Sequence, residues 1–156
     1  MKRLGIIALL WVFLALPAFA SMVSFLIVEE GSGAPANNYS AVWEDELMGA
    51  FFDAGHIVSN SPILRVESLS DSELPVEVNA DYDEAYYGGA DYFILAVLEF
   101  RPQNGQSRLN SVVIKIFTTN SQTLIYERRF AAGTGQNASE LARAKETAQI
   151  VAAQIQ

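Results

Sequence analysis

The second half of the chain carries a strong pattern for an antiparallel sheet. Residues 90–100 (ADYFILAVLEF) form a long, almost wholly apolar run, and Asn104-Gly105 follows it. Asn-Gly is the strongest short-range signal for a hairpin turn. Residues 109–119 and 123–131 then alternate between apolar and polar positions, and Asn120-Ser121 separates them as a second tight turn. Strands joined by turns this short pair antiparallel, so the pattern predicts a three-stranded meander.

Alternation also assigns side chains to the two faces of this meander. In the middle strand we expect one face to hold Val112, Ile114 and Ile116, and the other to hold Val113, Lys115 and Phe117. In the last strand we expect one face to hold Leu124, Tyr126, Arg128 and Phe130.

Helices and further strands surround the meander. Residues 22–28 (MVSFLIV) are β-branched and aromatic and predict a buried strand, and residues 56–58 predict a short one. Apolar residues at three- and four-residue spacing predict helices over residues 39–54 and 137–156. Residues 76–87 are a third helix candidate, although valines at its start favour extended backbone.

The two periodic helices have defined apolar stripes and ends. The first stripe consists of Trp43, Leu47, Ala50, Phe51 and Ala54, and the last of Leu141, Ala144, Ala148, Val151, Ala152 and Ile155. Gly55 directly follows the first helix and is expected to adopt the left-handed conformation that ends helices. Asn137 precedes Glu140 by three residues, a variant of the capping box.

The order of these elements predicts an α+β fold. We expect a mixed, mostly antiparallel sheet of about four to five strands with two to three packed helices. The first strand reaches the sheet through a helix, so it is expected to lie parallel to one neighbour. Residues 59–75 are hard to assign, and residues 63–66 fit either a strand or a turn of helix.

The first twenty residues match a secretory signal peptide. Lys2 and Arg3 precede thirteen residues from Leu4 to Leu16 that are all apolar apart from one glycine. Pro17 ends this run, and Ala18-Phe19-Ala20 offers the small residues that a signal peptidase reads. We therefore predict a signal peptide over residues 1–20 and a single interaction domain over residues 21–156, periplasmic or secreted and without a stable membrane anchor. The alternative is an uncleaved anchor that extends through the apolar residues up to Val28.

Charge and composition limit the classes of function. The formal net charge is −8, and it becomes −10 when Lys2 and Arg3 leave with the signal peptide. This charge argues against a nucleic-acid partner, which needs a cationic surface. The absence of cysteine excludes disulfides, thiolate metal sites, a cysteine nucleophile and a lipidated cysteine.

The sequence offers little catalytic chemistry. His56 is the only histidine, and its place after a helix-ending glycine favours a structural role over that of a catalytic base. No Gly-x-Ser-x-Gly elbow supplies a nucleophile, and Gly133-Thr134-Gly135 lacks the lysine and spacing of a phosphate-binding loop. We therefore expect no enzyme, no cofactor and no metal.

Carboxylates and tyrosines gather in one stretch, which holds Asp71, Glu73, Glu77, Asp81, Tyr82, Asp83, Glu84, Tyr86 and Tyr87. A solvated helix face explains such a charge run most simply. A partner-binding surface is the functional alternative, because aromatic rings supply contact area and carboxylates steer a basic partner. Its predicted residues are Tyr82, Asp83, Glu84, Tyr86 and Tyr87, and helical spacing suggests that only one tyrosine pair is free. A calcium loop is a further reading, although the spacing departs from the EF-hand template.

The segment Gly89-Ala90-Asp91-Tyr92-Phe93, with the hairpin and terminal helix after it, resembles a periplasmic α/β module. The module is similar to the amino-terminal domain of TolB, to the related domain of the curli-secretion lipoprotein CsgG, and to lipoprotein activators of penicillin-binding proteins. The resemblance covers residues 22–156 in element order and only this motif in identity. The chain departs from the lipoproteins because it lacks the lipidated cysteine, and from TolB because no propeller follows. The resemblance implies a stand-alone adaptor.

Together these features predict a periplasmic, non-catalytic interaction or adaptor module of the bacterial cell envelope, with an envelope protein as its partner. Two alternatives remain: a periplasmic protein that binds a small ligand or metal, and a carboxylate-based hydrolase that acts on the cell wall. A deep pocket with convergent carboxylates favours the enzyme, whereas exposed tyrosines and a free strand edge favour the adaptor.

Overall fold

The computed structural model describes residues 20–31, 38–103, 105–132 and 137–155. These residues form a mixed sheet in the order β2-β1-β4-β5-β6, and β3 also pairs with β1. The strands are β1 (Met22–Glu30), β2 (Ile57–Asn60), β3 (Leu64–Val66), β4 (Tyr92–Gln103), β5 (Gln106–Thr118) and β6 (Thr123–Ala131). The helices are α2 (Tyr39–Asp53), α3 (Asn79–Tyr87) and α4 (Asn137–Ala152), and a 3-10 turn, η1 (Val76–Val78), leads into α3.

Strand pairing confirms the predicted α+β class. β1 lies parallel to β2, β3 and β4, whereas β4, β5 and β6 form the expected antiparallel meander. β2 and β3 lie along the same edge of β1, because β2 pairs with its first residues and β3 with its last. The described residues form six strands rather than four to five, because residues 59–75, whose sequence pattern is ambiguous, contain β3.

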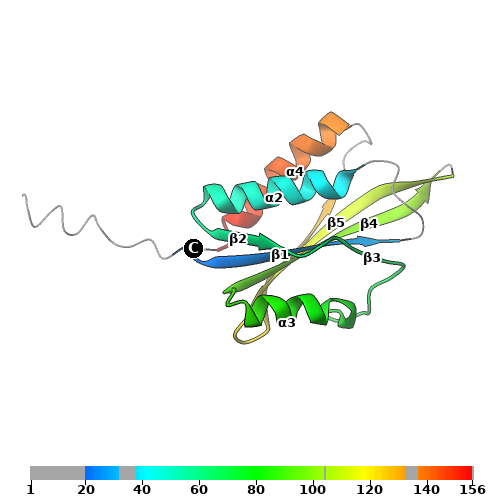
Figure 1. Cartoon of the computed structure of the whole chain (residues 1–156). Helices are drawn as coiled ribbons and strands as arrows, with labels where there is room; N and C mark the ends of the chain where they lie inside the picture. The colour runs from blue at the N-terminus through cyan, green and yellow to red at the C-terminus, as the bar shows by residue number, and fades with distance from the viewer. Residues whose placement is uncertain (1–19, 32–37, 104, 133–136, 156) are drawn as a thin grey trace, which may run out of the picture.

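The helices cover both faces of the sheet (Figure 1). α2 and α4 lie together on one face, where Trp43, Leu47 and Phe51 of α2 are fully buried against the strands. α3 lies on the other face and packs over a second apolar cluster that includes Leu95 and Phe93. β1 and β4 are buried on both faces, which explains why their sequences are almost continuously apolar.

Two of the helices end in the same hydrogen-bonded motif. At the end of α2, the His56 N–H donates to the Phe51 carbonyl at 3.1 Å and the Gly55 N–H donates to the Phe52 carbonyl at 2.9 Å. Gly55 has φ +92°, so the predicted left-handed glycine is confirmed. α3 ends in the same way at Gly89, with φ +83°. Both ends are Schellman motifs, which satisfy the last carbonyl groups of a helix and set the direction of the next strand.

A β-bulge corrects the predicted faces of β6. The register shifts between Ile116 and Phe117, so Ile116 pairs with Tyr126 while Phe117 pairs with Leu124. The extra residue turns Leu124 to the α3 face, whereas Tyr126 packs on the opposite face. The expectation that Leu124 and Tyr126 share a face is therefore wrong, because a bulge breaks the two-residue period.

The stripe of α4 also differs from the prediction in one turn. Leu141 is exposed, and the neighbouring Glu140 is buried instead. The Glu140 carboxylate accepts a hydrogen bond of 2.8 Å from the Trp43 indole N–H, which joins α4 to α2. The helix also ends earlier than expected, at Ala152, while Ile155 beyond it is still buried. The side chain of Asn137, the other half of the expected capping box, lies outside the described side chains.

The hairpin between β4 and β5 forms as predicted from Asn104-Gly105. Gln103 pairs with Gln106 across the turn, and Gly105 has φ +76°. Asn104 itself lies outside the described residues. The outer part of this hairpin projects beyond the two helix layers (Figure 1).

Among the described residues, none of the helices has the length and apolar character needed to cross a membrane. Most of the predicted signal peptide, residues 1–19, lies outside the part of the chain that the structure describes.

Candidate interaction surfaces

The structure places Tyr82 in the core, which corrects its assignment to the partner-binding surface. Tyr82 is only 6% exposed, and its ring packs edge-on against Phe93 with ring centroids 5.4 Å apart. Its hydroxyl donates to the Thr119 carbonyl at 2.6 Å. Burial raises the pKa of the Tyr82 phenol, and the nearby charge of Asp83 adds to this effect. Tyr82 therefore holds α3 on the sheet and is not available to a partner.

The other four predicted residues form an exposed surface on α3, which we call the tyrosine surface: Asp83, Glu84, Tyr86 and Tyr87. Tyr87 is 82% exposed and Tyr86 is 45% exposed. Their rings meet edge to face, with centroids 5.3 Å apart. The exposed pair is thus formed by two adjacent residues at the end of α3, rather than by a pair four residues apart. Exposed aromatic rings flanked by carboxylates suit contact with a partner that carries positive charge.

The remaining carboxylates of this stretch do not gather into a metal site. Glu77 accepts hydrogen bonds from the backbone N–H and the hydroxyl of Ser70. A hydrogen bond from its own backbone N–H, together with those from Ser70, lowers the pKa of Glu77. Within the described residues, no group of three or more His, Asp or Glu side chains is placed to hold a metal ion. Glu77 instead fixes the loop that leads from β3 into η1.

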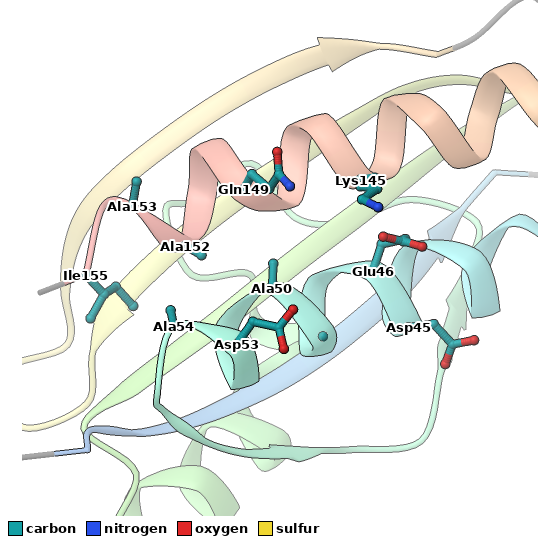
Figure 2. Close-up of a pocket in the computed structure, with 11 residues that line it drawn as sticks. Asp45, Glu46, Ala50, Asp53, Ala54, Lys145, Gln149, Ala152, Ala153 and Ile155 are labelled. Atoms are coloured by element: carbon teal, nitrogen blue, oxygen red, sulfur yellow. The ribbon is translucent and has the colours of Figure 1, made fainter.

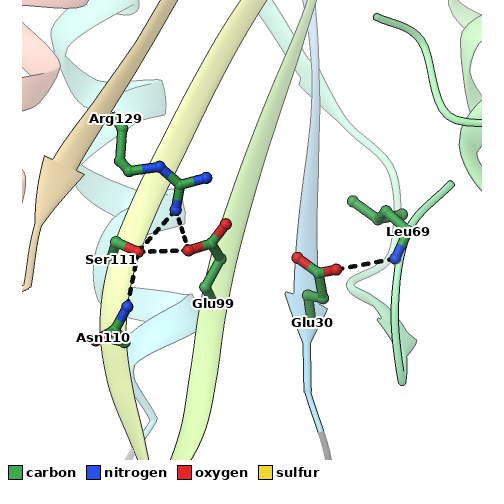
Figure 3. Close-up of polar contacts among 6 residues, drawn as sticks. All are labelled: Glu30, Leu69, Glu99, Asn110, Ser111 and Arg129. Carbon is green, nitrogen blue, oxygen red and sulfur yellow. Dashed lines mark hydrogen bonds and ion pairs between the residues drawn. The ribbon is translucent and has the colours of Figure 1, made fainter. Parts of the chain in front are cut away.

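A second polar group, which the sequence pattern did not reveal, joins β4, β5 and β6 (Figure 3). The Glu99 carboxylate accepts hydrogen bonds from the Ser111 hydroxyl and the Arg129 guanidinium, which also forms an ion pair with it. Burial alone would raise the pKa of Glu99, but the hydrogen bonds from Arg129 and Ser111 outweigh it, so the pKa is lowered. Glu99 is therefore held in its charged form.

Glu30 lies beside Glu99 across the parallel pair of β1 and β4. Its carboxylate accepts a hydrogen bond of 2.9 Å from the Leu69 backbone N–H (Figure 3). Glu30 therefore holds the loop after β3 in place, and Glu99 holds β6. These bonds give the pair a structural role.

A groove lies between α2 and α4, on the opposite side of the sheet from α3 (Figure 2). It has a volume of about 610 Å³. Five of its eleven lining residues are small, and its charged lining residues are Asp45, Glu46 and Asp53 from α2 and Lys145 from α4. The sequence signal that could have indicated this groove is a set of small residues near the ends of both helix patterns: Gly49, Ala50, Ala54, Ala152 and Ala153.

His56 is part of the helix end described above. Its ring lies against Phe51, with ring centroids 5.8 Å apart, and its Nδ1 atom is buried without a hydrogen-bond partner among the described residues. His56 therefore lies at the end of a helix, as predicted. Its contact with Phe51 is the one that commonly accompanies a Schellman motif, between the last turn of the helix and the second residue after the C-cap.

Comparison with known families identifies the group to which the chain belongs. A family model described as "Uncharacterised protein" matches residues 22–156, so the chain is a member of that family. No curated protein matches the chain.

Solved structures with a similar fold include the dodecameric PelC of Paraburkholderia phytofirmans. One PelC structure is 12% identical, with a TM-score of 0.52, over 90% of this chain and 91% of PelC. At this identity the likeness shows a shared fold. TolB of Acinetobacter baumannii also matches, with 9% identity and a TM-score of 0.43, over 89% of this chain and 28% of TolB. Lipoprotein GNA1162 of Neisseria meningitidis matches with 14% identity and a TM-score of 0.45, over 85% of this chain and 97% of that protein.

Proposed function

We propose that the chain is a non-catalytic interaction module of the bacterial cell envelope, and that it binds a protein partner through the tyrosine surface. The observation that carries this proposal is the exposed ring pair of Tyr86 and Tyr87 beside Asp83 and Glu84. Tyrosine is enriched at binding hot spots because it combines a large apolar ring with a polar tip.

The anchoring of α3 supports this role. The Tyr82 hydroxyl and ring fix the helix to the sheet, and the Schellman motif at Gly89 fixes its end. The two exposed rings therefore project from a rigid element, which lowers the entropy lost when a partner binds. Tyr86 and Tyr87 are more exposed than Tyr82, so they contribute less to the packing of α3 on the sheet.

The cellular setting of the proposal comes from the signal-peptide pattern of residues 1–20. The interaction role has a separate support: PelC, which has a similar fold, was solved as a dodecamer, so this fold can serve as a building block of protein assemblies. A periplasmic location and an envelope protein as partner are therefore part of the proposal.

Capture from an envelope extract tests the proposal. The bait is the exported protein, compared with the double variant Tyr86→Ala/Tyr87→Ala. Phe52→Ala/Ile57→Ala is the matched control, because it also removes two exposed apolar side chains, away from α3. Circular dichroism confirms that each bait is folded.

We expect the wild type and the control to retain the same partner, and the tyrosine variant to lose it. Loss of two anchoring rings should cost about 2 kcal/mol or more of binding free energy, measured by titration once the partner is identified. Asp83→Asn/Glu84→Gln should mainly slow association and reduce its salt dependence. Full affinity in the folded tyrosine variant would show that the partner does not bind through the tyrosine surface.

A further inference from the structure

The outer part of the β4–β5 hairpin carries two arginines directly opposite each other. Arg101 and Arg108 are cross-strand partners, and both are exposed. Neither forms an ion pair with a residue that the structure describes, whereas Arg65 pairs with Glu29 and Arg129 pairs with Glu99. Like charges directly opposite in antiparallel strands repel each other. An anionic surface placed against the hairpin would remove this repulsion.

The groove between α2 and α4 offers a surface of the opposite charge. Asp45, Glu46 and Asp53 line it, against the single cation of Lys145 (Figure 2). Neither helix has a basic residue in its last turn. The last residues of α2 and α4 lie at the same end of the groove, so the partial negative charges of both helix ends add to the charge of Asp53.

Gly49 provides an observation that is independent of charge. It lies within α2 and lines the groove, at a position where glycine destabilises a helix relative to alanine. A Cβ atom at this position would meet no atom within 4 Å apart from the adjacent residues and the backbone of its own helix. The packing of the chain itself therefore does not require a glycine here. Glycine does allow a second backbone to approach the helix closely.

The β4–β5 hairpin projects at the end of the molecule opposite to the C-terminal ends of α2 and α4 (Figure 1), where Asp53, the last residue of α2, lines the groove. From their opposite charges and this placement, we propose that the chain associates with copies of itself head to tail. Arg101 and Arg108 of one copy occupy the α2–α4 groove of the next, beside Asp45 and Asp53. This contact joins two different surfaces, so it builds a ring or a filament rather than a two-fold dimer. It goes beyond the proposed function and uses none of the residues of the tyrosine surface.

Charge reversal in the exported protein tests this contact by sedimentation velocity over a series of protein and salt concentrations. The hairpin variant is Arg101→Glu/Arg108→Glu, and the groove variant is Asp45→Lys/Asp53→Lys. We expect the wild type to form oligomers that dissociate as salt rises, and each variant to associate at least about tenfold more weakly. The chain with all four substitutions restores opposite charges and the original net charge, and should form oligomers again.

A mixing experiment tests the head-to-tail geometry with milder substitutions. Arg101→Ala/Arg108→Ala keeps an intact groove, and Asp45→Asn/Asp53→Asn keeps an intact hairpin. Each should be monomeric alone, and a mixture should form only a one-to-one dimer, because a single junction remains possible. A wild type that stays monomeric at every concentration would overturn the proposal. The proposal would also fail if the chain with all four charge reversals did not reassemble while circular dichroism shows it folded. Dimers formed by the alanine variant alone, or by the asparagine variant alone, would overturn it too.

Discussion

Replacement of glycine by alanine should change the stability of the fold in opposite directions at two glycines of the α2 region. Gly49 lies inside the helix, and Gly55 follows its end with φ +92°. A Cβ atom would meet no other part of the chain within 4 Å at either position, so clash with packed neighbours contributes to neither effect. The two sites differ in backbone conformation, and that difference should decide the sign of the change in stability.

The expected magnitudes follow from this difference. Gly49→Ala should stabilise the protein by about 0.5–1 kcal/mol, because alanine favours a helix interior and restricts the unfolded chain. Gly55→Ala gains a similar restriction of the unfolded chain but places a side chain in the left-handed region, which costs about 1–2 kcal/mol. The net result at Gly55 should be a loss of around 1 kcal/mol, so the two variants should differ by about 2 kcal/mol.

Urea unfolding measures this difference. Trp43 is fully buried and supplies a fluorescence signal, and circular dichroism at the same urea concentrations tests two-state behaviour. We expect the slope of unfolding free energy against urea concentration to be unchanged in both variants. The two urea midpoints should move in opposite directions. Equal shifts of the two midpoints, or a more stable Gly55→Ala protein, would show that the helix does not end in the Schellman motif in solution.

Further predictions concern the buried contacts and the exported form. Tyr82→Phe should keep the fold and lose about 1 kcal/mol in urea unfolding, because the hydroxyl bond to the Thr119 carbonyl disappears. The lowered pKa of Glu99 stabilises the fold above the ordinary glutamate pKa of about 4.3, and this contribution is lost as pH falls through the folded-state pKa. The urea midpoint of Glu99→Gln should therefore fall less than that of the wild type between neutral and acid pH. EDTA should leave the thermal midpoint unchanged, and a drop that calcium restores would reveal a metal site. Mass spectrometry of the exported protein should find Ser21 at its N-terminus, and a membrane-retained chain that begins at Met1 would favour an anchor.

Elements with a clear local signal could be predicted from the sequence. The meander follows from alternation and the Asn-Gly turn, and the end of α2 follows from Gly55, because these signals depend on a few adjacent residues. The parallel position of β1 follows from its connection through a helix. The sequence pattern does not decide between strand and helix for β3, because its three residues are ordered by pairing with β1, which is far away in the sequence.

Tertiary contacts decided the features that the sequence pattern did not predict correctly. Helical spacing placed Tyr82 and Tyr86 on one face, but contact with Phe93 and Thr119 buries only Tyr82. Leu141 has the more apolar side chain, yet Glu140 is buried because the Trp43 indole supplies a hydrogen bond from another helix. Such partners are far away in the sequence, so no local period reveals them.

Photo-crosslinking tests the central claim of a partner at the tyrosine surface most directly. A photo-reactive amino acid replaces Tyr87 in cells that export the protein, and the same amino acid at position 52 serves as the exposed control away from α3. We expect irradiation to join the chain through position 87 to one defined protein of the envelope, and to give no such product through position 52. A folded, exported protein that forms no adduct at position 87, or the same adducts at both positions, would contradict the claim.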